Sequence, residues 1–368
     1  MDFTATQADE LIAQHGSPLL VISKRRLVQN YQTLARQLPK AAIYYAVKSN
    51  PHPIVLNTLA ELGAGFDVAS AGELDQVLEQ GIGVGRTIYT NPIKPFGAIE
   101  YLSHKGIDVF VFDNDSELKK IAATAPGAGV LLRLNVINPN CVVDLGQKFG
   151  CPPNSAEGLL GQAFKLGLNP RGLCFHVGSQ TSIPQPYVDT LLECRNLFNR
   201  MALSGHPLEI LDIGGGFPIS YKTSAMSIEA FCGPIRSSLE MYFPDTTILV
   251  EPGRVIVGST ATLLARVIGK ENRNGVMWYY IEDGLYGSLS GCVFDHAEYR
   301  ITSTIGGPLQ PCIVAGPTCD SFDIISKQEC LPDLAVGDVI LVHDVGAYSN
   351  ASATTFNGHP LTKVVAIS

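Results

Sequence analysis

The sequence predicts a (β/α)8 barrel of the TIM type, an α/β fold, joined to a second, mostly antiparallel β domain. In the first two thirds of the 368 residues, short apolar runs alternate with stretches whose apolar residues recur at helical spacing. After about residue 258 the helical periodicity fades, and the apolar runs are separated by Gly, Pro and Asp. We therefore expect residues 26–258 to form the barrel, and residues 1–25 together with 259–368 to form the β domain.

Eight candidate strands lie in the barrel segment. Near-continuous apolar strands are typical of a parallel sheet covered by helices, and eight of them within about 210 residues favour a closed barrel over an open, doubly wound sheet. The expected strands are Ala42–Ser49, Gly65–Ser70, Thr87–Ile93, Val109–Asn114, Val130–Val136, Leu173–Ser179, Ile210–Gly215 and Thr247–Glu251. Expected helices between them include Ile54–Leu62, Ala71–Gln80 and Ser116–Ala123.

The β domain is expected from apolar runs bounded by turn residues. These runs are Ala261–Ile268, Val276–Ile281, Gln310–Val314 and Asp338–Val342. Near the N-terminus, Pro18–Ser23 has the same character, so we expect it to be a strand that joins this domain.

The composition argues against several classes of partner. The net charge is −8 and no basic stripe is present, which makes nucleic acid and anionic membranes poor partners. No apolar run approaches the ~20 residues that span a bilayer, and no secretory signal is visible. The nine cysteines show no metal-binding spacing. We expect a cytoplasmic protein without a metal, in which eight of the nine cysteines are small core residues.

Polar residues follow nearly every predicted barrel strand. In such a barrel the carboxyl ends of the strands form the active site, so these residues are the candidates for chemistry. They are Lys48, Asp67, Asp113, Arg133, His176, Ser179, Gly214–Gly216, Glu251 and Arg254.

Lys48 ends a hydrophobic strand, where an ammonium group is costly to bury. It either extends to solvent at the rim or, with a lowered pKa, forms a Schiff base with an aldehyde. The loop Asp212–Phe217 offers successive backbone amides that suit a phosphate, although glycine triplets also make plain tight turns.

Glu251 and Arg254 follow the last barrel strand. A carboxylate there suits a protonated pyridine nitrogen and an arginine suits a phosphate, while the alternative is a surface ion pair. His176 on its own is as compatible with a satisfied core histidine. Together, a Schiff-base lysine, an anion cradle and a pyridinium partner on one rim point to pyridoxal 5'-phosphate.

The motifs of the chain resemble those of the fold-type III pyridoxal-phosphate enzymes, which have an alanine racemase-like barrel. The resemblance is to their ornithine/diaminopimelate decarboxylase group, which includes the basic amino-acid decarboxylases, and it covers nearly the whole chain. The matching segments, in family order, are Tyr45–Asn50, Phe66–Ser70 with Glu73, Phe175–Ser179, Asp212–Pro218, Glu251–Arg254, Asp283–Ser288, Gly316–Asp320, Gly346–Tyr348 and Phe356–Gly358.

The resemblance implies a role for each residue at the barrel mouth. Lys48 would carry the cofactor aldehyde, His176 would stack on its ring and Glu251 would pair with the ring nitrogen. The phosphate region would be held by Gly214, Gly215, Gly216, Ser179, Arg254 and Tyr348. A network near Lys48 would contain Asp67, Glu73 and Arg133.

The resemblance also implies residues from a second subunit. Cys319 would return a proton to the substrate Cα atom, which a thiol can do at neutral pH. In this group of enzymes Cys319, Asp320 and Phe356 would enter the site from the partner subunit, so a homodimer with two equal sites is expected.

The substrate is expected to be a small basic L-amino acid. The diaminopimelate enzymes carry Cys-Glu-Ser where this chain has Cys319-Asp320-Ser321. In the segment Phe294–His296, Asp295 matches an aspartate that binds a distal amine, and Tyr286 and Phe356 belong to the same expected substrate set.

Chain length is harder to predict, because one methylene contributes only ~1–3 kcal/mol of discrimination. Phe294 replaces a tyrosine of many family members, and Gln180 also departs from the commoner residue. L-Ornithine, giving putrescine in polyamine biosynthesis, is the first expectation. L-Lysine is second, and L-arginine or another diamino acid is the further alternative.

Two other functions share this fold. An amino-acid racemase would need a second base, and the Cys319-Asp320 pair favours decarboxylation instead. A non-catalytic pyridoxal-phosphate-binding or regulatory homologue is disfavoured because Lys48, Glu251, Arg254 and Cys319 are all present.

Overall fold

The computed structural model describes residues 3–368, which form two compact units. One unit consists of Asn30–Pro218 and Ala225–Gly253; the other takes the N-terminal segment up to Gln29, Ile219–Ser224 and Arg254–Ser368. We call them the barrel unit and the β unit. The expected division at residues 25/26 and 258/259 did not include the short segment Ile219–Ser224 in the β unit.

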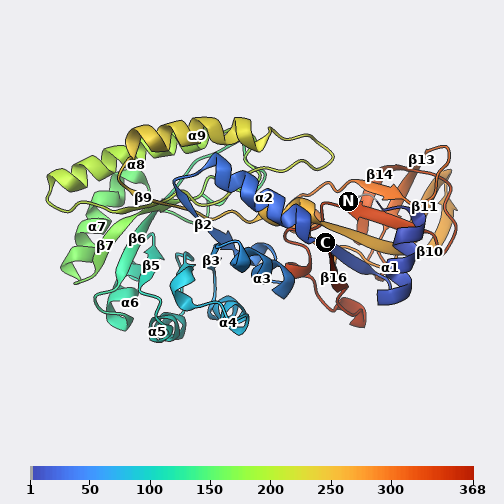
Figure 1. The fold of residues 1–368 in the computed structure, drawn as a ribbon, viewed down its shortest axis with the longest axis horizontal. Coiled ribbons are helices and arrows are strands. Elements are labelled where there is room, and N and C mark those ends of the chain that lie inside the picture. Colours follow the sequence, from blue (N-terminus) through green and yellow to red (C-terminus); the bar gives the residue numbers. More distant parts are fainter. Residues whose placement is uncertain (1–2) are drawn as a thin grey trace. The chain divides into compact units, whose positions relative to one another are not determined.

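The barrel unit contains a closed barrel of eight parallel strands, which confirms the predicted fold class. Figure 1 shows these strands with helices along the outside. The strands are β2 (Ala41–Ala46), β3 (Gly65–Val68), β4 (Thr87–Tyr89), β5 (Val109–Phe112), β6 (Gly129–Leu134), β7 (Asn169–Phe175), β8 (Ile210–Asp212) and β9 (Thr247–Val250). The helices after α2 (Lys24–Gln37) are α3 (Pro53–Glu61), α4 (Ala71–Glu79), α5 (Phe96–Lys105), α6 (Asp115–Thr124), α7 (Ala156–Lys165), α8 (Gln185–Leu203) and α9 (Ile228–Tyr242).

The predicted barrel strands are confirmed in number and order, but each was predicted to extend too far at its C-terminal end. β2 ends at Ala46, and Val47–Ser49 form a 3-10 turn instead of continuing the strand. β8 ends at Asp212, before the glycine triplet. Polar and glycine residues leave the hydrogen-bonded sheet here because they line the barrel mouth, where side chains serve a site and not a core.

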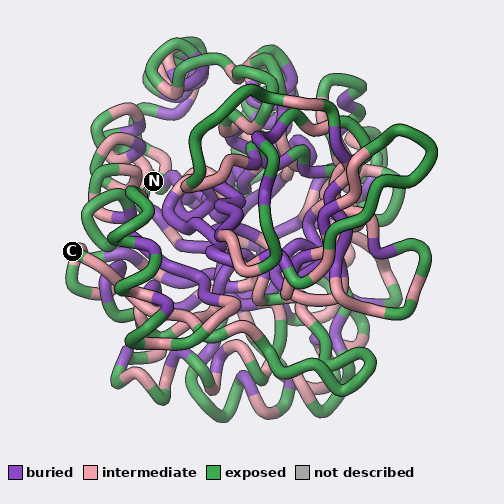
Figure 2. The backbone as a smooth tube through the Cα atoms, turned by 90° about the vertical axis from the view of Figure 1, so that its right-hand side faces the viewer, coloured by how far each residue is buried: buried purple, intermediate pink, exposed green. Residues whose placement is uncertain are grey.

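Apolar side chains pack inside the barrel, away from the carboxyl ends of its strands. Val111, Leu131 and Ile210 belong to one buried cluster that comes from different strands. Gly65 is required on β3 because a Cβ atom there would lie 2.6 Å from Cε1 of Tyr44. Figure 2 colours buried residues purple and exposed residues green, and the purple segments lie mainly in the interior. The sheet is therefore a rigid support for the loops at its carboxyl edge.

The β unit contains an eight-stranded sheet in the order β12-β15-β10-β11-β13-β14, with β1 beside β10 and β16 beside β1. Most pairs are antiparallel, while β1–β16 and β11–β13 are parallel. The prediction that the N-terminal segment joins this sheet is confirmed by the pairing of β1 with β10. The strands are β1 (Leu19–Ser23), β10 (Ala261–Arg273), β11 (Val276–Ile281), β12 (Ile301–Ser303), β13 (Gln310–Ala315), β14 (Ile324–Leu331), β15 (Val339–His343) and β16 (Lys363–Ile367).

Three α-helices accompany the sheet in this unit: α1 (Ala5–His15) and the short α10 (Arg254–Val257) and α11 (Gly291–Phe294). Ala8 and Ile12 of α1 pack on Leu264 and Leu341 of the sheet. Thr4 starts α1 with a capping box, in which its side chain accepts the backbone N–H of Gln7. Within residues 3–368, no helix has the length and apolar character needed to cross a membrane.

The expectation that eight cysteines are core residues is wrong for at least one of them. Cys330 is exposed on β14, which lies at the edge of the sheet next to β13. Cys141 and Cys292 are only partly buried, and Cys319, the predicted exception, is exposed. The remaining five are buried, as expected for small apolar side chains.

A buried lysine ties two strand ends of the barrel unit together. Lys94 is 1 % exposed and donates to the backbone oxygens of Asn91, Pro92 and Val111 at 3.0, 3.1 and 2.6 Å. Its ammonium also lies 3.0 Å from Oε1 of Glu117. Burial lowers the pKa of Lys94 to about 8, although the Glu117 charge opposes that shift.

We expect Lys94→Met to destabilise the protein by about 3–5 kcal/mol, because it leaves the buried Glu117 carboxylate without one of its two cationic partners. The melting temperature should fall by several degrees. Lys119→Met is the matched control, since Lys119 pairs with Asp115 on the exposed surface of α6, the helix that also carries Glu117. Equal melting temperatures for the two variants would contradict the structural role of Lys94.

Candidate active site

Lys48 lies at the mouth of the barrel, in the 3-10 turn that follows β2. Its Nζ atom is 3.2 Å from Oδ2 of Asp67, at the end of the neighbouring strand β3. The other oxygen of Asp67 accepts a hydrogen bond of 2.7 Å from Thr90. Asp67 is 1 % exposed while the lysine side chain is 40 % exposed. The carboxylate thus orients an amine that remains open to a reactant.

Glu73 belongs to the same network, as the sequence predicted. Its Oε2 atom accepts the backbone N–H of Ala69 at 2.7 Å, and Ser70 caps α4 by accepting the N–H of Glu73. Burial raises the pKa of Glu73, and the nearby Asp67 charge adds to this while Lys48 opposes it. Two carboxyl groups therefore lie near one amine.

His176 follows β7 and carries an uncharged ring. Its Nδ1 atom accepts the backbone N–H of Gly178 at 3.0 Å, which places the ring hydrogen on Nε2. Burial lowers the pKa of His176 well below its usual value, and the positive charges of Arg133 and Lys48 lower it further. A neutral, flat ring held in one orientation is suited to stacking on an aromatic ligand.

The glycine triplet after β8 forms a concave backbone surface. Gly214 and Gly216 have φ values of +66° and +118°, which side chains rarely adopt. A Cβ atom on Gly215 would collide with the backbone oxygen of Glu251 and lie 3.3 Å from Nε2 of His176. The hydroxyl of Tyr187 donates to the Gly215 oxygen at 2.8 Å. Such a fixed loop presents amides that suit a phosphate group.

Two carboxyl groups are buried directly below this loop. Asp212 is fully buried and Glu251 is 8 % exposed. Burial raises the pKa of Glu251 well above its usual value, and the Asp212 charge contributes as well. Burial also raises the pKa of Asp212, to about 6. A carboxyl group here is suited to a hydrogen bond with a ring nitrogen.

The other residues predicted to lie at the barrel mouth make contacts that hold them or their loops in place. The guanidinium carbon of Arg133 lies 4.9 Å from the ring centroid of Phe149. Ser179 pairs with Val143 through its backbone N–H at 2.9 Å. Asp113 accepts the backbone N–H of Gly150 at 2.8 Å, so its carboxylate holds the loop after β6.

In the β unit, Arg254 lies among three polar or aromatic side chains and is 5 % exposed. Its Nη2 atom is 3.0 Å from Oδ2 of Asp295, and its Nη1 atom donates to the Tyr221 hydroxyl at 2.7 Å. Its guanidinium lies 4.9 Å from the Tyr348 ring centroid. Sequence reasoning missed Tyr221, since nothing in the chain order shows that Ile219–Ser224 belongs to this unit.

A second group of predicted residues lies together elsewhere in the β unit. The Tyr286 hydroxyl donates to Asp320, and the Tyr286 and Phe356 rings stack with centroids 4.2 Å apart. The exposed Cys319 donates from its backbone N–H and from Sγ to Oδ1 of Asn357, at 3.2 and 3.4 Å. Asn357, which sequence reasoning did not single out for this, holds the thiol in place.

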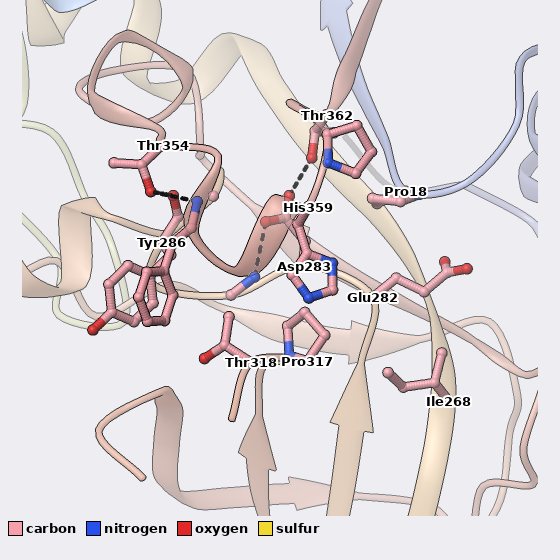
Figure 3. Close-up of a pocket in the computed structure, with 14 residues that line it drawn as sticks. Pro18, Ile268, Glu282, Asp283, Tyr286, Pro317, Thr318, Thr354, His359 and Thr362 are labelled. Carbon is pink, nitrogen blue, oxygen red and sulfur yellow. Dashed lines mark hydrogen bonds between the residues drawn. The ribbon is translucent and has the colours of Figure 1, made fainter. Parts of the chain in front are cut away.

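A cavity of about 240 Å³ adjoins this group, and Tyr286 and Phe356 form part of its wall. Figure 3 shows Thr354 bonded to the Tyr286 backbone and Thr362 bonded to Asp283. Phe294 is 65 % exposed, and its neighbour Asp295 contacts Arg254, whereas Asp320 contacts Tyr286. That Asp295 and Asp320 face one substrate ammonium stays a prediction.

Comparison with known proteins identifies the family of the chain. Residues 24–258 match the family described as "Pyridoxal-dependent decarboxylase, pyridoxal binding domain". The lysine/ornithine decarboxylase of Selenomonas ruminantium is 39 % identical over 350 residues, which covers 95 % of this chain and 89 % of the relative. The chain belongs to the pyridoxal-dependent decarboxylases. It is a carboxy-lyase with pyridoxal phosphate as its cofactor.

Solved structures agree over the full length. A Selenomonas ruminantium lysine decarboxylase variant in complex with pyridoxal phosphate has a TM-score of 0.97 and 38 % identity, covering 100 % of this chain and 96 % of that one. The lysine/ornithine decarboxylase of Vibrio vulnificus, solved with cadaverine, has a TM-score of 0.94, 38 % identity and full coverage of both chains. One similar relative, 37 % identical over 90 % of this chain and 77 % of its own, is named antizyme inhibitor 2, from Xenopus laevis.

The geometry of the barrel mouth suits this cofactor independently of the comparisons. Lys48 supplies an accessible amine, the glycine loop a backbone packed so closely on its neighbours that it has no room for a Cβ atom, and Glu251 a buried carboxyl group. His176 adds a neutral ring. These groups suit the aldehyde, phosphate, ring nitrogen and ring face of the cofactor.

Gly215→Ala should weaken binding of pyridoxal phosphate by more than about tenfold, equivalent to about 1.4 kcal/mol, because the added Cβ atom has no space beside the Glu251 backbone. The measurement is an absorbance titration of the cofactor-free protein. Gly97→Ala, at a position with open space around it, is the control and should bind normally. Normal affinity in Gly215→Ala would show that the loop is not the phosphate cradle.

Proposed function

We propose that the chain decarboxylates a basic L-amino acid with a terminal ammonium group, L-ornithine to putrescine first and L-lysine to cadaverine second. The observation that carries this proposal is the half-buried Asp320 carboxylate, which lies next to the exposed Cys319 and accepts a hydrogen bond from Tyr286. Hydrogen bonding from Tyr286 lowers the pKa of Asp320, so the group is an anion at neutral pH. A half-buried anion beside an aromatic side chain suits an alkyl ammonium chain.

Relatives support the same substrate class. The Selenomonas ruminantium relative is named for both lysine and ornithine, and the Vibrio vulnificus enzyme was solved with putrescine as well as cadaverine. The arginine decarboxylase of Paramecium bursaria Chlorella virus is more distant, with 29 % identity and a TM-score of 0.93. We place L-arginine and other diamino acids after ornithine and lysine.

The residues of the chain divide the catalytic work. When bound, the cofactor supplies a ring that takes up the electron pair left as CO2 departs. In the proposal Lys48 holds the cofactor aldehyde, His176 lies on the ring face, and Glu251 meets the ring nitrogen. Gly214–Gly216 bind the phosphate, with Ser179, Arg254 and Tyr348 in the same role.

Cys319 is the proposed proton donor to the substrate carbon that loses CO2. Its Sγ atom is exposed and oriented by Asn357, as a donor must be. Asp320 is the proposed main receptor of the distal ammonium, because Asp295 already has the Arg254 cation at 3.0 Å. Asp295, Phe294 and Phe356 complete the proposed substrate set.

We further propose a homodimer in which Cys319, Asp320 and Phe356 of one protomer complete the site of its partner. The exposure of Cys319 and Phe356 and the partial exposure of Asp320 in a single chain are compatible with this role. A cytoplasmic location is also proposed, supported by nine cysteines that are all free. The relative named antizyme inhibitor 2 makes a regulatory role the second candidate, which release of CO2 from ornithine would exclude.

Asp320→Asn should raise the KM for ornithine about 10- to 100-fold, because a charge-assisted hydrogen bond to the ammonium contributes about 1.5–3 kcal/mol. CO2 release is measured with ornithine, lysine, arginine, diaminobutyrate and diaminopimelate. Asp333→Asn, which alters an exposed carboxylate elsewhere in the β unit, is the control. A preference of the wild type for arginine or diaminopimelate would contradict the proposed substrate. An unchanged KM in Asp320→Asn would contradict the proposal that Asp320 binds the distal ammonium.

Subunit mixing tests the shared site. Lys48→Ala and Cys319→Ala homodimers should each be nearly inactive in decarboxylation. Random mixing makes about half of the dimers mixed, each with one intact site of two, so about a quarter of wild-type activity should return. Absence of any recovery after subunit exchange, verified with differently tagged chains, would show that each site is built within one chain.

A further inference from the structure

The carboxyl groups of Asp212 and Glu251 meet inside the barrel. Their side chains lie within hydrogen-bond reach of each other, at the ends of the adjacent strands β8 and β9. Both are buried, and Oδ2 of Asp212 has no protein donor. An ionised carboxylate only accepts hydrogen bonds, so two carboxyl groups in contact require a proton between them.

The surroundings favour one proton on this pair. Asp67 adds a third negative charge, while the cations that act on the pair are Lys48 and Arg133. Lys48 is engaged with Asp67 at 3.2 Å. The charge of the pair also acts on Tyr44, Cys174 and Tyr187, and the pKa values of all three are raised. Three buried acids against two cations cannot all be ionised cheaply.

Asp212 also connects the phosphate loop to Glu251. Its Oδ1 atom accepts the N–H of Gly214 at 2.9 Å, and the Gly214 oxygen accepts the N–H of Glu251 at 2.9 Å. The conformation of Gly214, with φ +66°, is thereby tied to both carboxyl groups. A change in the charge of Asp212 therefore acts on the two ends of the cofactor site together.

We propose that Asp212 is a positioning residue that shares one proton with Glu251 before the cofactor binds, so that the proton required by the ring nitrogen is already stored in the protein. On binding, the O–H bond of Glu251 breaks and an N–H bond forms on the ring nitrogen. Glu251 becomes an anion opposite a cation, and no electrons are transferred. Among the proposed roles, the inference rests only on Glu251 meeting the ring nitrogen, and not on the identity of the substrate.

The test is the number of protons taken up when pyridoxal phosphate binds to the cofactor-free protein. This number is obtained by calorimetry in buffers of different ionisation enthalpy. The pH is 7.5 to 8, about two units above the Asp212 pKa. In Asp212→Asn the amide donates to Glu251 and stabilises its anion, so no proton is stored. On binding the cofactor, the variant should take up about one proton more than the wild type does. Its affinity for the cofactor should therefore fall up to about tenfold for each unit by which the pH rises.

Reaction of Lys48 and titration of the free cofactor contribute equally to both proteins, so the difference isolates the pair. Asp108→Asn, at the exposed start of β5, is the control and should match the wild type. Equal proton uptake in the wild type and Asp212→Asn overturns the proposal. A purely structural role of Asp212 would lower affinity without changing the proton count.

A second measurement does not depend on how well Asp212→Asn folds. The infrared spectrum of the cofactor-free wild type should contain the carbonyl band of a buried, protonated carboxyl group that is absent from Glu251→Gln. Loss of that band on adding pyridoxal phosphate supports the proton transfer, and absence of the band from the cofactor-free protein overturns it. Failure to release CO2 from ornithine would disprove the proposed substrate but leave this result unchanged.

Discussion

The closure of eight parallel strands is the constraint on which the barrel unit depends. Closure forces all carboxyl ends to one mouth, where the strands no longer need apolar side chains. Lys48, Asp67, His176 and Glu251 come from separate strands spread over two hundred residues, and the barrel alone makes them neighbours. The apolar interior, filled by Val111, Leu131 and similar residues, holds this arrangement rigid.

Burial then decides the charge of each group at the mouth. The same desolvation keeps His176 neutral and raises the pKa values of Glu73, Asp212 and Glu251. Lys48 differs because its side chain is open on one side and held by Asp67 on the other. The site thus combines one accessible amine with acids and a base whose protonation is set by the protein interior.

The β unit supplies a different kind of surface. Arg254 is deeply buried and already surrounded by Asp295, Tyr221 and Tyr348, an arrangement suited to a fixed anion. Cys319 is exposed and is oriented by Asn357, while Asp320 is half-buried and accepts hydrogen bonds from Tyr286 and from the backbone N–H of Phe322. The contrast is one between a rigid, buried cation and a more accessible pair of side chains.

The sequence by itself determined the barrel and the sheet that follows it, and it predicted the main site residues. Alternating apolar periods and the motifs around Lys48, Gly214–Gly216 and Cys319 are local properties that can be seen without coordinates. The ends of the strands, the contact of Tyr221 with Arg254, the support of Cys319 by Asn357 and the contact within the acid pair were decided only by the tertiary structure. Each depends on distances between segments remote in the chain and on burial, which no local pattern encodes.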